Sequence, residues 1–164
     1  MIEIVRADIT TLDVDAIVNA ANEALLPGAG VCGAIYRVAG PRLYEATRAL
    51  QGCKTGNAGL TPGFDLAARF VIHAVGPMWR GGNDGEAADL RSAYTRAFRV
   101  AKTEHSIRSI AFPAISTGIY GFPKDEAAEV AVEVMRENEG DFDRIVACLF
   151  DEQSADIYRS LLAS

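Results

Sequence analysis

The stretch DAIVNAANEALLPGAGVCGAIY (residues 15–36) runs from a strand-like segment through a glycine-rich loop into a segment with helical spacing. Asp15–Ala20 is short and rich in branched side chains, which predicts a buried strand. Residues 31–50 predict a helix, and Pro41 after Gly40 predicts that it breaks into two pieces. The apolar residues available for its inward face are Ile35, Val38, Leu43 and Ala46. A strand, a loop and a helix in direct succession indicate an α/β protein.

The same alternation continues along the chain. Further strands are predicted at 2–5, 70–76, 106–115 and 142–150, and further helices at 86–104, 124–138 and 152–164. The inward face of the helix at 86–104 is predicted to carry Leu90, Tyr94, Ala97, Phe98 and Ala101. Helices that alternate with buried strands predict a largely parallel sheet covered on both faces. Such sheets bind ligands at the C-terminal ends of their strands, where residues 19–33, 113–123 and 150–153 are expected.

Length and composition narrow the function classes. The 164 residues contain no internal repeat, and we expect residues 1–164 to form a single domain. No apolar run approaches the roughly 18 residues of a membrane span, and the first residues lack a basic region followed by an apolar one. We therefore expect a cytoplasmic protein without a membrane partner. The net charge of −6 makes nucleic acid an unfavourable partner, but backbone amides can still hold a small anion.

The cysteines Cys32, Cys53 and Cys148 are odd in number, far apart and without a CxxC pair. This spacing argues against a disulfide framework or a zinc site, and no metal ion is expected. No cofactor is expected either. Cys53 and Cys148 are interpreted as small reduced residues. His73 in a predicted strand and His105 after a predicted helix are interpreted as structural.

Two glycine-rich loops could hold phosphate. ISTGIYG (115–121) and PGAGVCG (27–33) each precede or enter a helix, but neither matches the nucleoside triphosphate or dinucleotide motif. Gly118 and Gly121 permit backbone conformations that are closed to other residues. Each loop by itself is equally compatible with a tight turn, whereas two facing loops could grip a diphosphate. Asn19 and Asn22 follow a strand and suit either a turn or sugar hydroxyls.

Taken together, ADIT (7–10), VDAIVNAANEALLPGAGVCGAIYRVAGP (14–41), CKTGNAGLTPGFDLAARFVIHAVGP (53–77) and SIAFPAISTGIYGFPKDEAAEVA (109–131) resemble a macrodomain of the MacroD type. The resemblance covers nearly the whole chain in order. It implies a three-layer α/β/α fold with a central mixed, mostly parallel sheet, and it implies ADP-ribose binding.

Carried over by position, the resemblance implies a set of binding residues. Asp8 would accept a hydrogen bond from the adenine amino group beside the Ile9 backbone, and Phe150 would stack on the adenine. Asn22 would hydrogen-bond the distal ribose, over which Tyr120 would close. The backbone amides that would hold the diphosphate belong to Gly30, Val31, Cys32, Ser116, Thr117, Gly118, Ile119 and Tyr120.

The chain departs from the family at the reactive centre. MacroD-type enzymes hydrolyse esters that join ADP-ribose to protein Asp or Glu side chains, and they deacetylate O-acetyl-ADP-ribose. Their loop usually has the sequence GGGGVDGAIH, whereas this chain has PGAGVCGAIY, with Cys32 for the aspartate and Tyr36 for the histidine. The candidate catalytic residues are therefore Asn22 and, at the aspartate position, Cys32. A neutral thiol is a poor base for activating water, which predicts weakened hydrolysis.

Two function classes follow from this departure. The first is a monomeric hydrolase acting on ADP-ribosylated proteins or O-acetyl-ADP-ribose, with reduced activity. The alternative is a reader module that binds ADP-ribose without hydrolysis. An RNA-associated accessory protein is a third and weaker candidate, because the acidic charge opposes it.

Overall fold

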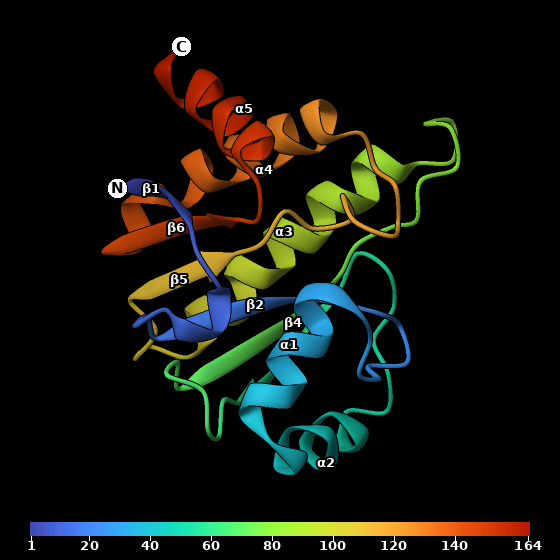
Figure 1. Ribbon diagram of the computed structural model, residues 1–164, viewed down its shortest axis with the longest axis vertical. Coiled ribbons are helices and arrows are strands. Elements are labelled where there is room, and N and C mark those ends of the chain that lie inside the picture. Colours follow the sequence, from blue (N-terminus) through green and yellow to red (C-terminus); the bar gives the residue numbers. More distant parts are fainter.

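A mixed sheet forms the centre of the computed structural model, which describes residues 1–164. Its six strands lie in the order β1-β6-β5-β2-β4-β3 (Figure 1). Every neighbouring pair is parallel except β3 and β4, which are antiparallel. The strands are β1 (Ile2–Arg6), β2 (Ala16–Ala21), β3 (Ala58–Pro62), β4 (Phe70–Val75), β5 (Ser109–Phe112) and β6 (Arg144–Leu149). This confirms the predicted mixed, mostly parallel sheet.

Helices cover both faces of the sheet. Alternate strand residues face opposite sides, so Ile17 packs with the cluster of α1 and α2, whereas Val18 packs with that of α3, α4 and α5. The helices are α1 (Gly30–Ala39), α2 (Pro41–Ala49), α3 (Glu86–Thr103), α4 (Lys124–Asn138) and α5 (Glu152–Ala163). Two short 3-10 turns are η1 (Ile9–Thr11) and η2 (Glu139–Asp141). The result is the three-layer α/β/α arrangement that the resemblance implied. None of the helices combines the length and apolar character needed to cross a membrane.

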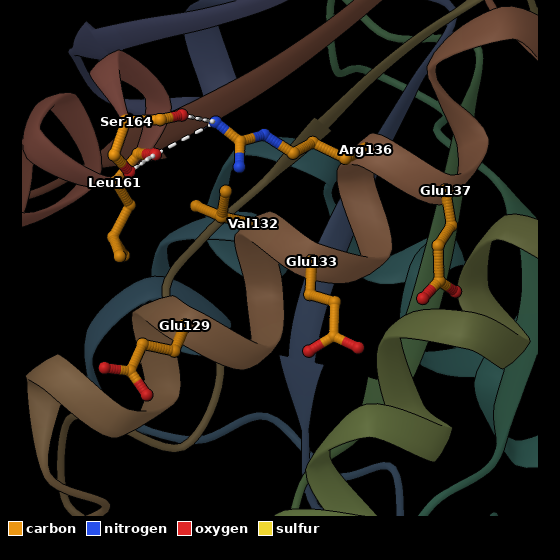
Figure 2. A pocket seen from close by; sticks show the side chains of 7 residues that line it. All are labelled: Glu129, Val132, Glu133, Arg136, Glu137, Leu161 and Ser164. Atoms are coloured by element: carbon orange, nitrogen blue, oxygen red, sulfur yellow. Dashed lines mark hydrogen bonds between the residues drawn. The ribbon is translucent and has the colours of Figure 1, made fainter.

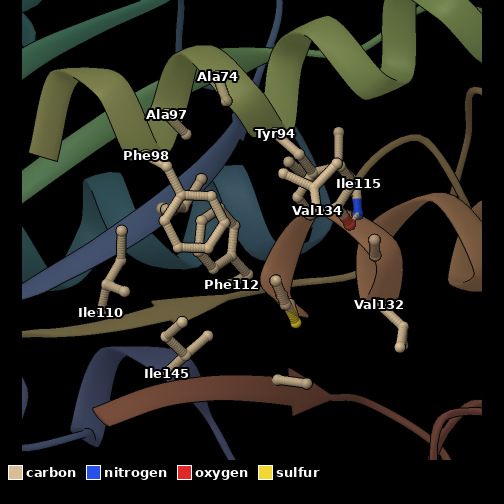
Figure 3. Packing of buried hydrophobic residues seen from close by; sticks show 14 of the residues in the cluster. Ala74, Tyr94, Ala97, Phe98, Ile110, Phe112, Ile115, Val132, Val134 and Ile145 are labelled. Atoms are coloured by element: carbon tan, nitrogen blue, oxygen red, sulfur yellow. Dashed lines mark hydrogen bonds between the residues drawn. The ribbon is translucent and has the colours of Figure 1, made fainter. Parts of the chain in front are cut away.

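The larger core lies between the sheet and α3, α4 and α5. Figure 3 shows Phe98 and Tyr94 of α3 beside Phe112 of β5, with ring centroids 4.7 and 5.5 Å from that of Phe112. Tilted aromatic pairs of this kind stabilise a core beyond the area they bury. The predicted inward face of α3 is buried at all five of its positions.

The smaller core differs from the sequence prediction at two positions. Ile35 and Leu43 are buried as predicted, but Val38 is 44% exposed and Ala46 is only partly buried. The buried face of α1 is formed by Cys32, Ile35, Tyr36 and Ala39. Val38 precedes Ala39 and is turned about 100° from it around the helix, which places it on the outer side.

Candidate functional site

Four loops meet at the edge where the parallel strands end. Asp8 follows β1, Phe150 follows β6, residues 113–123 follow β5, and residues 22–29 follow β2. The strand order β1-β6-β5-β2 places these segments in that sequence along one edge of the sheet (Figure 1). This is the edge at which open α/β sheets bind their ligands.

The loop after β2 presents the uncapped start of α1. Gly30 begins the helix with φ of +60°, a left-handed conformation that favours glycine. The N-cap residue Ala29 makes no side-chain hydrogen bond to the helix. The N–H groups of Gly30, Val31 and Cys32 therefore have no intrahelical acceptor and point out of a helix end that favours anions.

The loop after β5 leaves further amides free. The backbone N–H groups of Ser116, Gly118, Ile119 and Tyr120 donate to no acceptor in the protein. The Thr117 N–H, which was also expected to hold the diphosphate, is not free, because it lies 3.4 Å from the Ala114 carbonyl oxygen. The left-handed residues are Ser116 (φ +68°) and Gly121 (φ +74°), so Gly121 uses the conformational freedom of glycine, whereas Gly118 has no positive φ.

A buried tyrosine anchors the start of this loop. The Tyr94 hydroxyl accepts a hydrogen bond from the Ile115 N–H at 3.1 Å and donates to the Pro113 carbonyl at 3.3 Å. Tyr94 is fully buried, which raises the pKa of its hydroxyl to about 12. Both main-chain groups therefore have a neutral partner that holds the loop to α3. The Phe122 N–H closes the other side by donating to the Ser116 carbonyl at 2.9 Å.

Asn22 braces its own loop. Its Nδ2 donates to the Leu26 carbonyl and its Oδ1 accepts from the Leu26 N–H, both at 2.9 Å. One N–H and one lone pair of the amide remain for another partner. The Leu26 carbonyl also lies 3.7 Å from Cys32 Sγ, within range of a weak S–H hydrogen bond. Asn22 and Cys32 thus meet at the same carbonyl group.

Behind Cys32 lies a polar chain that the sequence analysis did not predict. Asn19 Nδ2 lies 3.7 Å from Cys32 Sγ and 3.2 Å from His73 Nδ1, and His73 Nε2 lies 3.0 Å from Thr61 Oγ1. Burial lowers the pKa of His73 to about 4, so its ring is neutral at pH 7. Asn19 is fully buried within β2, which overturns the expectation that it forms a turn or meets a sugar. The available signal was that Asn19 and His73 interrupt otherwise apolar strands.

Tyr36, at the family's histidine position, forms a hydrogen bond with the loop that follows β2. Its hydroxyl donates to the Leu25 carbonyl at 2.7 Å and lies 3.2 Å from Thr47 Oγ1. Burial raises the pKa of this phenol, so it stays protonated at neutral pH. Leu25 itself has φ of +56°, an uncommon value for leucine, which the bond from Tyr36 helps to hold.

The far end of the edge carries an exposed carboxylate and an exposed aromatic ring. Asp8 caps η1, because its Oδ1 accepts from the Thr10 N–H at 3.0 Å and from Thr10 Oγ1 at 2.7 Å. Its second oxygen remains open. The side chain of Ile9 is buried, and Phe150 is 89% exposed. An aromatic ring that exposed has no packing role within the chain.

Two cavities lie at different distances from these loops. One of about 410 Å³ is lined by Tyr120 and Glu23 together with residues from the segment 76–89. The other, of about 430 Å³, is lined by residues of α4 and α5 and contains no residue of the four loops (Figure 2). No group of three or more His, Cys, Asp or Glu residues is arranged to hold a metal ion.

Comparison with known proteins identifies the family. The Macro domain family model matches residues 18–131, well over half of the chain. The chain belongs to the macrodomain family. This macrodomain is 50% identical over 169 residues to an O-acetyl-ADP-ribose deacetylase of Klebsiella pneumoniae, which covers 99% of this chain and 96% of that protein. It is 49% identical to human ADP-ribose glycohydrolase MACROD2 over 163 residues, which are 96% of this chain and 38% of that protein.

A solved structure agrees with this assignment. The Oceanobacillus iheyensis macrodomain with ADP has a TM-score of 0.93 and 39% identity, covering 99% of this chain and 90% of that one. The relatives confirm that the chain is a MacroD-type macrodomain, as its motifs indicated.

Proposed function

We propose that this macrodomain binds ADP-ribose and hydrolyses ADP-ribosyl esters on protein carboxylates or on O-acetyl-ADP-ribose. The observation that carries the proposal is a set of backbone N–H groups without a protein acceptor. Three belong to the start of α1 and four to the loop after β5. Two sets of amides on adjacent loops suit a diphosphate, since each can satisfy oxygens on a different side of it.

The order of groups along the sheet edge supports the same ligand. ADP-ribose is a linear molecule of adenine, ribose, diphosphate and distal ribose. Asp8 and Phe150 lie at the ends of β1 and β6, followed by the free amides and then by Asn22 after β2. In this proposal Asp8 Oδ2 accepts from the adenine amino group, Phe150 stacks on the ring, and Asn22 and Tyr120 hold the distal ribose.

The local charge is compatible with this arrangement. Residues 22–36 and 113–121 contain no lysine or arginine. Amide dipoles therefore stabilise the two phosphates, and a protein of net charge −6 can still bind an anion.

Hydrolysis adds water across the ester and releases ADP-ribose and a free carboxylate. Cys32 is a weak candidate for the base, because its S–H faces the Leu26 carbonyl and its sulfur faces the amide of Asn19. In the proposed mechanism Asn22 orients the distal ribose, and a phosphate oxygen of the substrate accepts the proton of the attacking water. The relatives named as a deacetylase and a glycohydrolase support the reaction class.

A second candidate function is that of a reader without catalysis. Cys32 at the aspartate position favours it, since no other acidic side chain of the loop at 27–36 replaces the lost carboxylate. Release of ADP-ribose from a carboxylate-linked ADP-ribosyl protein, followed over time, separates the two functions: measurable turnover excludes the reader.

Binding itself is tested by calorimetry with ADP-ribose on the wild type, Asp8→Ala, Asp8→Asn and the nearby control Asp13→Ala. We expect Asp8→Ala to weaken binding by about 1–3 kcal/mol, because it removes a charged acceptor. Asp8→Asn keeps a side-chain oxygen for the η1 cap and separates that role from the charge. The proposal fails if the wild type gives no heat with ADP-ribose, or binds ribose phosphate without adenine equally well.

A further inference from the structure

The cavity of about 410 Å³ adjoins the end of the site where the distal ribose is proposed to lie. Tyr120 lines this cavity and also supplies one of the free amides, while its carbonyl accepts from the Trp79 N–H at 2.8 Å. Glu23, which directly follows Asn22, lines the cavity as well. The cavity is therefore continuous with the position of the group that an ADP-ribosyl ester attaches to the distal ribose.

The walls carry an excess of negative charge. The lining contains one guanidinium group, that of Arg80, and four carboxylates, those of Glu23, Asp84, Glu86 and Asp89. None of these carboxylates forms an ion pair with a lysine or arginine of the chain.

The other cavity is acidic too, but two of its three carboxylates are paired with a cation. There Glu133 and Glu137 pair with Arg91 at 3.1 and 2.6 Å. Figure 2 shows Arg136 of that cavity turned toward the carbonyls of Leu161 and Ser164. Of these two cavities, the one beside Tyr120 presents several carboxylates without cationic partners.

Two of the four carboxylates accept hydrogen bonds from backbone N–H and hydroxyl groups, and none of these donors carries a positive charge. The buried Glu86 accepts from the N–H groups of Arg80, Gly82 and Asp84 at 2.7–2.9 Å, and these bonds lower its pKa to about 2. Glu23 accepts from the N–H and hydroxyl of Thr55, both at 3.0 Å. Asp84 and Asp89 use their carboxylates in no such bond and remain available.

A second feature points to this wall independently of the carboxylates. Ser116 is only 6% exposed, and its Oγ has no hydrogen-bond partner. That oxygen is directed at Gly76, which lines the cavity, so closely that an added Cβ at Gly76 would lie 2.2 Å from it. A buried polar atom without a partner is uncommon, and here it belongs to a residue with a free amide and lies against a residue that lines the cavity.

We propose that this cavity binds the polypeptide that carries ADP-ribose, and that it prefers a segment with lysine or arginine next to the modified carboxylate. The inference rests on the proposed function. Two residues of extended chain span about 7 Å, so a cation one or two positions from the modified residue stays close to Asp84 and Asp89. Free ADP-ribose and O-acetyl-ADP-ribose lack this segment and gain nothing from these carboxylates.

The test uses peptides whose ADP-ribose is attached through a glutamine amide, since an amide in place of the ester prevents turnover. Three peptides differ only in their flanking residues, which are lysine, alanine or glutamate. Their affinities are measured for the wild type, for Asp84→Asn/Asp89→Asn, and for the control Glu129→Gln/Glu133→Gln, which removes two charges from the cavity of Figure 2.

We expect the wild type to bind the lysine peptide about fivefold more tightly than the alanine peptide at low salt, the scale of an exposed ion pair. The ratio should fall to about one in Asp84→Asn/Asp89→Asn and persist in the control. Equal affinities for all three peptides, or a preference that survives Asp84→Asn/Asp89→Asn, would overturn the inference. The affinity for free ADP-ribose is measured alongside. If the peptide preference is absent but ADP-ribose binds, only the inference has failed. If ADP-ribose does not bind, the proposed function has failed as well.

Discussion

Replacing Tyr94 with phenylalanine removes a single oxygen from the loop after β5. The ring still fits, because Tyr94 is fully buried and packs on Phe112. What disappears is the acceptor for the Ile115 N–H and the donor to the Pro113 carbonyl. Two main-chain groups are then left buried without a partner at the start of the segment that carries four free amides.

The expected cost follows from those two groups. A buried group that loses its hydrogen-bond partner costs about 1–3 kcal/mol, so at the lower end of this range the two groups together cost about 2 kcal/mol in Tyr94→Phe. In a domain of 150–250 residues this lowers the midpoint of thermal unfolding by about 4–8 °C. The loop must then be ordered again on binding, and its looser state should weaken ADP-ribose affinity by roughly two- to tenfold.

The assay combines thermal unfolding with ADP-ribose calorimetry on Tyr94→Phe and on Tyr44→Phe. Tyr44 lies on α2 and is 38% exposed. Tyr44→Phe is therefore a control that removes the same hydroxyl group at a position away from the loop. If the two variants melt together, the hydrogen bonds of Tyr94 contribute little. If Tyr94→Phe is destabilised but binds ADP-ribose like the wild type, the loop does not depend on this anchor.

Three further predictions concern the site and its surroundings. Cys32→Asp should raise ester hydrolysis by at least about tenfold because it restores a carboxylate beside the sugar; loss of a robust wild-type turnover in Cys32→Ala, with ADP-ribose affinity unchanged, would instead make the thiol catalytic. ADP-ribose affinity should change little between roughly 50 and 200 mM salt, the range over which counterion release has a steep effect. The reason is that residues 22–36 and 113–121 contain no lysine or arginine. Calorimetry at both salt concentrations checks this prediction. Since the pKa of His73 falls from 6.5 unfolded to about 4 folded, the unfolded chain binds a proton between these values and the folded chain does not. Stability should therefore be lost as pH falls through this window, and urea unfolding of His73→Gln should show a smaller loss.

The helices of the fold were predictable because their signals are local. In α3 and α4 the apolar spacing, and the acidic residues in the first turn, lie within the segment itself. β3 was not predicted, since its sequence AGLTP contains a glycine and a proline. It is a strand only because it pairs along its length with β4 at the edge of the sheet.

The site was predictable as two glycine-rich loops but not in its detail. Ser116, and not Gly118, takes the left-handed conformation, and the Ser116 hydroxyl lies against Gly76, which is remote in the sequence. The partners of Asn19 and Tyr36 are likewise remote in sequence: His73 is 54 residues from Asn19, and Leu25 and Thr47 are each 11 residues from Tyr36. Periodicity carries no information on such pairs.

The division of the interior into two clusters has a consequence for how binding energy is distributed. The start of α1 belongs to the smaller cluster through Cys32 and Ile35, whereas the loop after β5 belongs to the larger one through Ile115 and Phe122. A diphosphate held by both loops crosses from one helical layer to the other over the end of the sheet. Its binding free energy therefore opposes separate opening of either layer, so that the ligand makes unfolding more cooperative as well as less favourable.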